Sequence, residues 1–198
     1  TAFSFGLRGN HEIRRARKVA NKLGVKWLNL PSRVHQLTKL YSSTDRRRYS
    51  NLCFSGQSSP IWLDFEAIYI LKTRAMIPND ALIINGFSGD FLFGGHIPDE
   101  LVKSPRLETL SDYIIAKHCS HFTSDHFERC TTAIRDQLLG EYEEIFGLRA
   151  DVNSLCSFYE YWDWKERQVK AVVSGQRLYD AFHLDWRLPF WNKELMGF

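Results

Sequence analysis

The sequence has 198 residues, of which 44% are hydrophobic and 14% aromatic, enough for a substantial folded core. The formal net charge of +3 is too mild to indicate a nucleic-acid partner, but it leaves a phosphate-bearing ligand possible. The cysteines have irregular spacing and no CxxC pair, which argues against a disulfide framework and favours reduced thiols in the cytoplasm. No apolar run approaches the ~18–20 residues that span a bilayer, so no membrane association is expected.

The first part of the chain predicts strands that alternate with helices. Residues 1–6 contain two β-prone phenylalanines and predict a strand that ends at Gly6. Asn10 is expected to cap a helix that Gly24 stops. A second strand is predicted over residues 25–30, closed by Pro31.

A helix is predicted next over residues 32–41, followed by a polar loop that runs to Ser59. This loop contains the tightest basic cluster of the chain, Arg46, Arg47 and Arg48. Such a cluster is either a solvated loop, which is the commoner case, or a loop that contacts an anion.

Proline at the first position predicts a helix that begins at Pro60 and continues to residue 76. Residues 81–84 are apolar on both faces and predict a central parallel strand covered by helices. Beyond Pro98 the pattern predicts helices, over 104–122, 124–147 and 151–182, and no further strand. We therefore expect an α/β portion over residues 1–98, with a doubly wound parallel sheet, and a helical portion over 99–198.

The segment ALIINGFSGDFLFGGH, residues 81–96, places one carboxylate, Asp90, among glycines and other small residues. It follows a predicted strand, and ligands bind beyond the carboxyl ends of strands in open α/β sheets. Gly86, Ser88 and Gly89 would let backbone N–H groups approach an anion, and Asp90 could hold a magnesium ion that bridges phosphates. The alternative is a glycine-rich connector in which Asp90 caps a helix.

Two further clusters could carry chemistry. The first is a group of possible zinc ligands whose irregular spacing favours ordinary helix residues: His118, Cys119, His121, His126 and Cys130. The second is a basic group near the end of the chain that accompanies tryptophan, proline and phenylalanine: Arg167, Lys170, Arg177 and Arg187. Its members either face water or neutralise charge on a leaving phosphate or a tetrahedral intermediate.

Five segments, in this order, resemble the synthetase domain of asparagine synthetase and its relatives, including β-lactam synthetase. They are TAFSFGLRGNHEIRRARKVANKLGVKW, SSPIWLDFEAIYILKTRA, NGFSGDFLFGGH, RQVK and WRLPFWNKELM. The third is similar to the signature Ser-Gly-x-Gly-x-Asp-x-x-x-Gly-Gly-Tyr, and the fourth to an Arg-x-x-Lys motif. The variant form is most similar to the uncharacterised asparagine-synthase-related proteins.

The resemblance implies an ATP pyrophosphatase fold of the adenine nucleotide α-hydrolase type. It also implies a ligase that activates a carboxylate as an acyl-adenylate for attack by ammonia or an amine, with ATP and Mg²⁺ as cofactors. A glutaminase domain or protein would supply ammonia. By position, Phe5 and Gly6 would meet the adenine, and Asp90 would bind Mg²⁺. The remaining implied positions are the nucleotide-binding Asn85, Gly86 and Ser88 and the catalytic Lys170.

The chain departs from the family pattern in three ways. The pyrophosphate loop Ser-Gly-Gly-x-Asp-Ser is expected ahead of Thr1, in a longer protein or a separate gene fragment. Phe87 stands where the synthetases carry glutamate or tyrosine and cannot transfer a proton, so Glu160 or Asp163 are candidates for a base. The stretch between Lys170 and Pro189 is longer than in the family. Two alternatives follow, a degenerate domain that binds a nucleotide or partner, and another nucleotide-binding enzyme such as a thiolation-type pyrophosphatase.

Overall fold

The computed structural model describes residues 1–54, 56, 60, 62, 64–120 and 124–197. The chain forms two compact units, each built from two segments. Unit 1 comprises Thr1–Gly86 and Lys170–Pro189, and unit 2 comprises Phe87–Val169 and Phe190–Phe198. The sequence predicted two portions that are each continuous, residues 1–98 and 99–198. In the structure, unit 1 is discontinuous, because the chain returns to it at Lys170.

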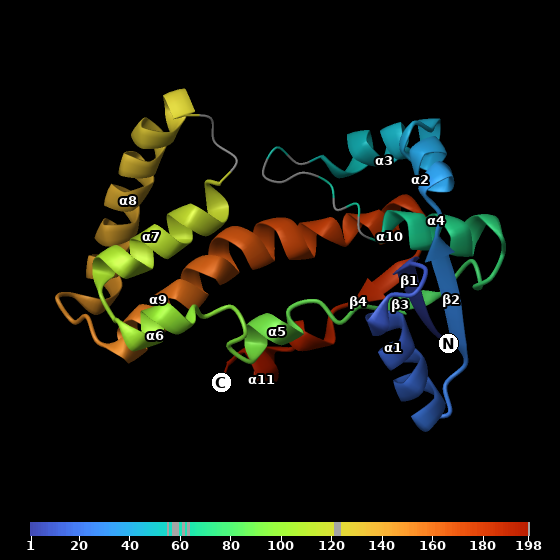
Figure 1. Cartoon of the computed structure of the whole chain (residues 1–198), viewed down its shortest axis with the longest axis horizontal. Helices are drawn as coiled ribbons and strands as arrows, with labels where there is room; N and C mark the ends of the chain where they lie inside the picture. Colours follow the sequence, from blue (N-terminus) through green and yellow to red (C-terminus); the bar gives the residue numbers. More distant parts are fainter. Residues whose placement is uncertain (55, 57–59, 61, 63, 121–123, 198) are drawn as a thin grey trace. The chain divides into compact units, whose positions relative to one another are not determined.

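Unit 1 is mixed α/β, as predicted, but its described residues form two separate parallel strand pairs instead of the single doubly wound sheet that was expected. Strand β1 (Ala2–Leu7) pairs with β2 (Trp27–Ser32), with Phe5 opposite Leu30. Helix α1 (His11–Lys22) connects them (Figure 1), and the predicted cap is confirmed because Asn10 Oδ1 accepts a hydrogen bond from the Glu12 N–H at 2.9 Å.

The second pair joins segments that are far apart in the sequence. Strand β3 (Leu82–Ile84) lies parallel to β4 (Asp185–Arg187), with Ile83 opposite Trp186. The prediction that no strand follows Pro98 is therefore wrong. The prediction of a strand covered on both faces is also wrong, because Ile83 is buried while Leu82 and Ile84 are exposed.

Two other boundaries in unit 1 differ from those predicted. Pro31 lies inside β2 opposite Gly6 instead of closing it, which is possible because β2 pairs along one edge only among the described residues. The predicted polar loop contains helix α3 (Thr44–Cys53), which Ser43 Oγ caps by accepting the Arg46 N–H. The basic cluster is thus helical.

The helix expected to begin at Pro60 begins at Phe65 instead, as α4 (Phe65–Thr73), while Pro60 and Trp62 are not helical. Ser59 and Ile61, which belong to the same prediction, lie outside the described residues. Helix α2 (Val34–Tyr41) and helix α10 (Arg177–Ala181) complete unit 1. Its core joins both sheets to α4 and contains Leu30, Phe65, Ile68, Leu71, Ile83, Leu178 and Tyr179.

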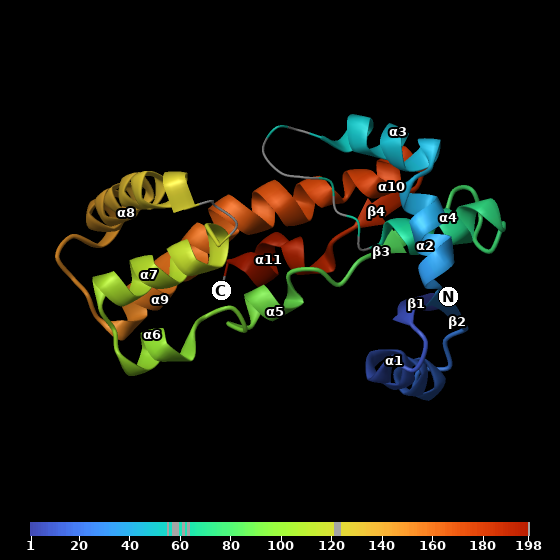
Figure 2. The ribbon, with the colours of Figure 1, turned by 45° about the horizontal axis from the view of Figure 1, so that its top comes forward.

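Unit 2 is helical. Its short helices are α5 (Gly89–Leu92), α6 (Asp99–Lys103) and α11 (Lys193–Met196), and its long ones are α7 (Leu107–His118), α8 (Ser124–Phe146) and α9 (Val152–Asp163). The predicted helices at α7 and α8 are confirmed. Figures 1 and 2 show α6, α7, α8 and α9 side by side around a core of Leu101, Leu110, Ile114, Leu138, Tyr142, Leu155, Phe158 and Tyr159.

The segment predicted as one helix over residues 151–182 changes its winding twice. An α-helix forms up to Asp163, then a π-helix, η1 (Trp164–Val173), and then α10 after a turn at Gln176. A 3₁₀ turn, η2 (Pro189–Trp191), precedes α11. π-Helical segments are rare, and most are single-turn bulges inside α-helices, which occur frequently at functional sites.

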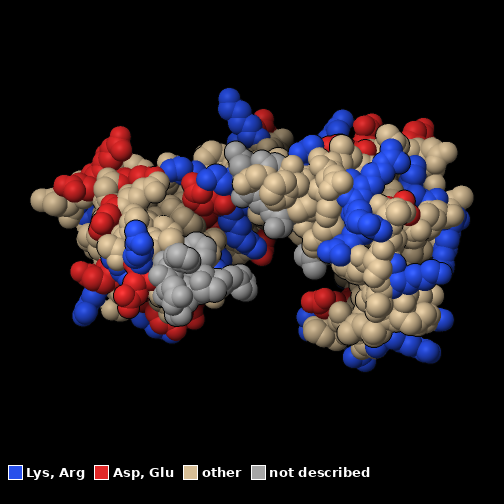
Figure 3. Space-filling view, turned by 90° about the horizontal axis from the view of Figure 1, so that it is seen from above, with Lys and Arg blue, Asp and Glu red and all other residues tan. Residues whose placement is uncertain are grey.

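The two units differ strongly in charge. Unit 1 carries 17 Lys and Arg against 7 Asp and Glu, a net +10, whereas unit 2 carries 9 against 16, a net −7. In Figure 3, Lys and Arg are dense over unit 1, and Asp and Glu are numerous on unit 2. The mild total charge of the chain hides this segregation, which favours anionic ligands on unit 1 and cationic ligands on unit 2. Within the described residues, no helix has the length and apolar character that crossing a membrane requires.

Candidate functional site

The carboxyl ends of β1 and β2 border a pocket of about 560 Å³. Its lining is mainly apolar and comprises Phe5, Gly6, Leu7, Ser32, Leu37, Tyr41, Trp62 and Glu66. The Tyr41 and Trp62 rings lie 6.1 Å apart between centroids, and the Ser32 hydroxyl donates a hydrogen bond to Glu66 Oε2 at 2.6 Å. Phe5 and Gly6, two predicted nucleotide-binding positions, therefore share one pocket, at the strand ends where α/β sheets bind ligands.

Gly6 has a backbone conformation that suits this place. Its φ of +133° is one that residues with a side chain rarely adopt. A Cβ added at Gly6 would lie 3.7 Å from Asn10 Nδ2 and 3.9 Å from Ile13 Cδ1, on the side of helix α1.

Arg46 lies against the aromatic side of the pocket. Its guanidinium carbon is 4.5 Å from the Trp62 ring centroid and 5.2 Å from that of Tyr41, and Nη1 donates to the Tyr41 carbonyl at 2.9 Å. Arg47 and Arg48, in contrast, are exposed. The basic cluster therefore divides into one residue that packs on aromatic rings and two that face solvent.

Asn85, at the end of β3, belongs to a second polar group in unit 1. Its Nδ2 donates to Tyr179 Oη at 2.7 Å and to Asp64 Oδ2 at 3.2 Å, and the Tyr179 hydroxyl donates to the same Asp64 oxygen at 2.8 Å. Burial raises the pKa of Asp64, although these two hydrogen bonds oppose the rise. Burial and the nearby Asp64 charge raise the pKa of Tyr179. Asn85 is thus held by two side chains, and it donates together with Tyr179 to a single oxygen of the Asp64 carboxylate.

The glycines that flank α5 differ in how far backbone geometry requires them. Gly86 has open space where a side chain would stand. A Cβ at Gly95 would lie 2.9 Å from the Asp90 carbonyl oxygen, and Gly94 has a φ of +73°. Gly95 therefore permits a close approach to the Asp90 backbone, and Gly94 a conformation that residues with a side chain rarely adopt.

Ser88, in unit 2, is a buried residue with a left-handed backbone, at φ +69°. Its hydroxyl donates to Gln168 Oε1 at 2.7 Å and accepts a hydrogen bond from Trp191 Nε1 at 3.0 Å. Gly89 approaches the ring of Phe190, which would lie 3.1 Å from an added Cβ. Ser88 thus anchors the turn before α5, and its side chain is already occupied by protein partners.

Asp90 lies in α5 with its side chain 70% exposed. Its Oδ1 accepts the Phe91 N–H at 2.9 Å, and its Oδ2 lies 2.9 Å from His96 Nε2. Burial opposes its ionisation, but the hydrogen bonds from His96 and Phe91 together lower the pKa of Asp90 overall. The carboxylate is therefore ionised and accessible, as a metal ligand requires, and it is held by the imidazole.

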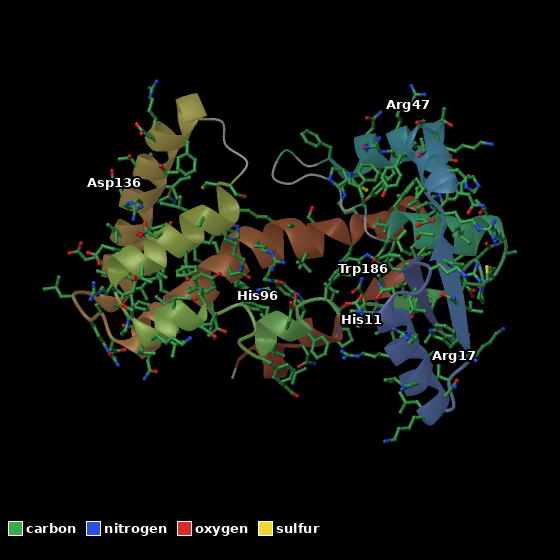
Figure 4. All side chains as sticks on the ribbon, in the orientation of Figure 1. His11, Arg17, Arg47, His96, Asp136 and Trp186 are labelled. Carbon is green, nitrogen blue, oxygen red and sulfur yellow. The ribbon has the colours of Figure 1, made fainter. Side chains whose placement is uncertain are left out.

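His96, labelled in Figure 4, connects Asp90 to a buried carboxylate. Its Nδ1 lies 3.0 Å from Oδ2 of Asp163, whose side chain is 1% exposed. Gln168 Nε2 donates to the same oxygen at 2.9 Å, and Lys117 Nζ donates to Oδ1 at 3.1 Å. Although burial opposes it, these donors lower the pKa of Asp163. Asp163, one candidate base, therefore positions His96 instead of meeting a substrate.

Sequence reasoning missed His96 and Lys117. His96 closes the quoted segment and follows its glycine pair, so its proximity to Asp90 was the one signal available. Lys117 lies on α7, whereas Asp163 lies at the end of α9, and no sequence motif links them. Glu160, the other candidate base, lines a pocket in unit 2 with Phe91 and Trp164.

Lys170 lies in the π-helix η1, half-buried, and belongs to unit 1, whereas Ser88 and Asp90 belong to unit 2. The predicted site residues are therefore divided between the units. Phe5, Gly6, Asn85, Gly86 and Lys170 lie in unit 1.

The described residues contain no group of three or more His, Cys, Asp or Glu side chains arranged to hold a metal ion. His118 lies in α7 and Cys119 at its end, whereas Cys130 lies in α8, and His121 lies outside the described residues. A magnesium ion needs fewer protein ligands, because it binds one or two carboxylates and completes its coordination shell with phosphates and water. The exposed Asp90 carboxylate fits that requirement.

No protein-family model, curated protein or solved structure matches the chain.

Proposed function

We propose that this chain is the nucleotide-binding portion of an ATP-dependent, asparagine synthetase-like amide ligase. The observation that carries the proposal is the pocket at the carboxyl ends of β1 and β2. It combines an apolar lining, the neighbouring rings of Tyr41 and Trp62, and a glycine with positive φ near the end of β1. These are the features that a flat, aromatic base requires in a parallel α/β unit.

The charge of unit 1 supports the same ligand class. A net +10 attracts a polyphosphate, and Arg46 places a cation behind the aromatic wall. In the proposed reaction, the backbone at Phe5 and Gly6 contacts adenine, while Asn85 and Gly86 lie beside the nucleotide. Asp90 would hold Mg²⁺, which supplies charge neutralisation on the phosphates when bound. Lys170 would neutralise charge that develops on the α-phosphate during adenylation.

The proposal also needs a pyrophosphate-binding loop. In the family that the chain resembles, this loop precedes the strand that corresponds to β1. In the described residues, β1 pairs only with β2 and β3 only with β4, so both pairs have an edge available to a further strand. The proposed substrates are a small carboxylate and ammonia or an amine. A degenerate domain that binds a nucleotide without turnover is the second candidate, supported by Phe87 at the position of the family's proton-transferring residue.

Pyrophosphate release separates the two candidates. A protein that carries this chain together with the loop should release pyrophosphate from ATP in the presence of Mg²⁺ and a panel of carboxylates. Asp90→Asn should abolish the Mg²⁺-dependent rate, and Lys170→Ala should lower kcat far more than ATP affinity. ATP binding without release for any carboxylate would support the degenerate domain. Unchanged activity of Asp90→Asn would refute the role of that residue.

A further inference from the structure

Unit 2 contains a separate pocket of about 350 Å³ that the proposed nucleotide site does not use. Its walls come from α5, the α9–η1 junction and α11, and include Phe91, Glu160, Tyr161, Trp164, Leu195 and Met196. All of these residues belong to unit 2, so the pocket is complete without unit 1. Its volume is suitable for a small organic molecule.

The pocket contains one acid, Glu160, which is half-buried. Among the described side chains and backbone groups, none donates a hydrogen bond to this carboxylate or forms an ion pair with it. Burial and the nearby negative charge of Asp163 raise the pKa of Glu160, although His96 partly opposes the rise. A carboxylate in such surroundings is stabilised by a cation that enters the pocket.

The nearest cationic side chain on the same helical segment is already bound elsewhere. Lys165 Nζ lies 2.8 Å from Glu141 Oε1 and 2.9 Å from Oε2, an ion pair that connects η1 to α8. It also lies 5.9 Å from the Tyr161 ring centroid. Glu160 therefore has no direct ion pair among the described side chains, while the neighbouring lysine is paired with another acid.

Aromatic side chains supply the rest of the recognition surface. Tyr161 and Trp164 remain 37% and 38% exposed, and Phe91 is buried beneath them in the same pocket. Phe158 of the core packs on Tyr161, with ring centroids 5.9 Å apart, and so restrains its position. Aromatic rings near a carboxylate attract ammonium groups through the ring quadrupole as well as through charge.

We propose that this pocket binds an organic amine. The ammonium group lies at the Glu160 carboxylate, and the apolar body contacts Phe91, Trp164 and Leu195. The net charge of −7 on unit 2 also favours a positively charged ligand. An apolar alcohol of the same shape fills the volume but leaves the acid without a partner, and an apolar carboxylate brings a second negative charge to it.

The test uses the full chain and three probes of one shape, namely phenethylamine, 2-phenylethanol and 3-phenylpropionate, in titration calorimetry. We expect phenethylamine to bind about tenfold more tightly than the alcohol, and the carboxylate to bind more weakly than both. Equal affinity for amine and alcohol, preference for the carboxylate, or no binding at all would overturn the proposal.

Two variants assign the binding to this pocket. Glu160→Gln keeps the shape and removes the charge, so it should lower amine affinity about tenfold and leave alcohol affinity within about twofold. Glu144→Gln, an exposed change on α8 of the same unit, is the matched control and should change neither. Circular dichroism of each variant establishes that the fold is retained. Retained amine selectivity in Glu160→Gln would place the site elsewhere and overturn the proposal.

Discussion

Replacing Asp163 by asparagine should destabilise unit 2 far more than the same change at an exposed acid. The Asp163 side chain is 1% exposed and accepts hydrogen bonds from Lys117 and Gln168 while it faces His96 Nδ1. Asparagine has nearly the same shape but no charge, and its amide nitrogen faces donors. The substitution therefore leaves the positive charge of Lys117 beside a neutral amide that cannot balance it.

The size of the effect follows from the exposure of those partners. Removing one member of a fully buried ion pair costs about 3–5 kcal/mol. Lys117 is 32% exposed and can recover part of its hydration, so we expect a loss of about 2–3 kcal/mol in the free energy of unfolding. Asp112 pairs with Arg135 at 2.7 Å but is 65% exposed, and Asp112→Asn should cost less than about 1 kcal/mol.

Urea unfolding followed by circular dichroism measures both variants at neutral pH. We expect a clear drop in the urea concentration at the midpoint of unfolding for Asp163→Asn and a small one for Asp112→Asn. The slope of unfolding free energy against urea concentration should be similar in both. If the two changes cost the same, or if Asp163→Asn costs less than about 1 kcal/mol, then Asp163 does not organise the donors around it.

Two further predictions concern backbone space and pH. Gly95→Ala should lower stability by more than about 1 kcal/mol, because its Cβ would lie 2.9 Å from a carbonyl oxygen; Gly140→Ala, inside α8 with open space, should raise it by up to about 1 kcal/mol in the same urea assay. Burial, with Lys117 nearby, lowers the pKa of His118 to about 4, so its contribution to stability is complete above about 6.5 and is lost as the pH falls towards 4. His118→Phe should therefore flatten the decline in urea midpoint between about pH 6.5 and 4; an unchanged decline would contradict this.

Long, capped, amphipathic elements were predictable from the sequence. Helix α1 has Asn10 before it and Gly24 after it. Its amphipathic pattern indicates a helix, and these two residues indicate where the helix begins and ends. Helices α7 and α8 have the same helical periodicity over many residues.

Short or unusual elements were not predictable in the same way. Helix α3 buries only Tyr49 and Cys53, one turn apart, so its pattern resembles that of a polar loop. Strand β4 has three residues and exists because β3, about a hundred residues earlier, pairs with it. The π-helix η1 has no periodic signature that separates it from an α-helix.

The candidate site residues likewise divide into those that could be predicted from the sequence and those that could not. Gly6 and Asp90 could be selected because their residue types suit a strand end and a metal ligand. The contact of His96 with Asp163 depends on tertiary packing between segments 67 residues apart, which local pattern does not encode. The Glu160 pocket depends likewise on α5 and α11 meeting the end of α9.

The affinity for adenosine tests the central claim most directly, because the proposed base pocket lies within the described chain. Leu7 is 61% exposed and lines this pocket, whereas Leu148 is 96% exposed and lies in unit 2. Titration calorimetry should show that adenosine binds the wild type and Leu148→Glu equally, and that Leu7→Glu binds about fivefold more weakly or worse. Absence of adenosine binding, or equal binding by Leu7→Glu, would contradict a nucleotide site at the ends of β1 and β2.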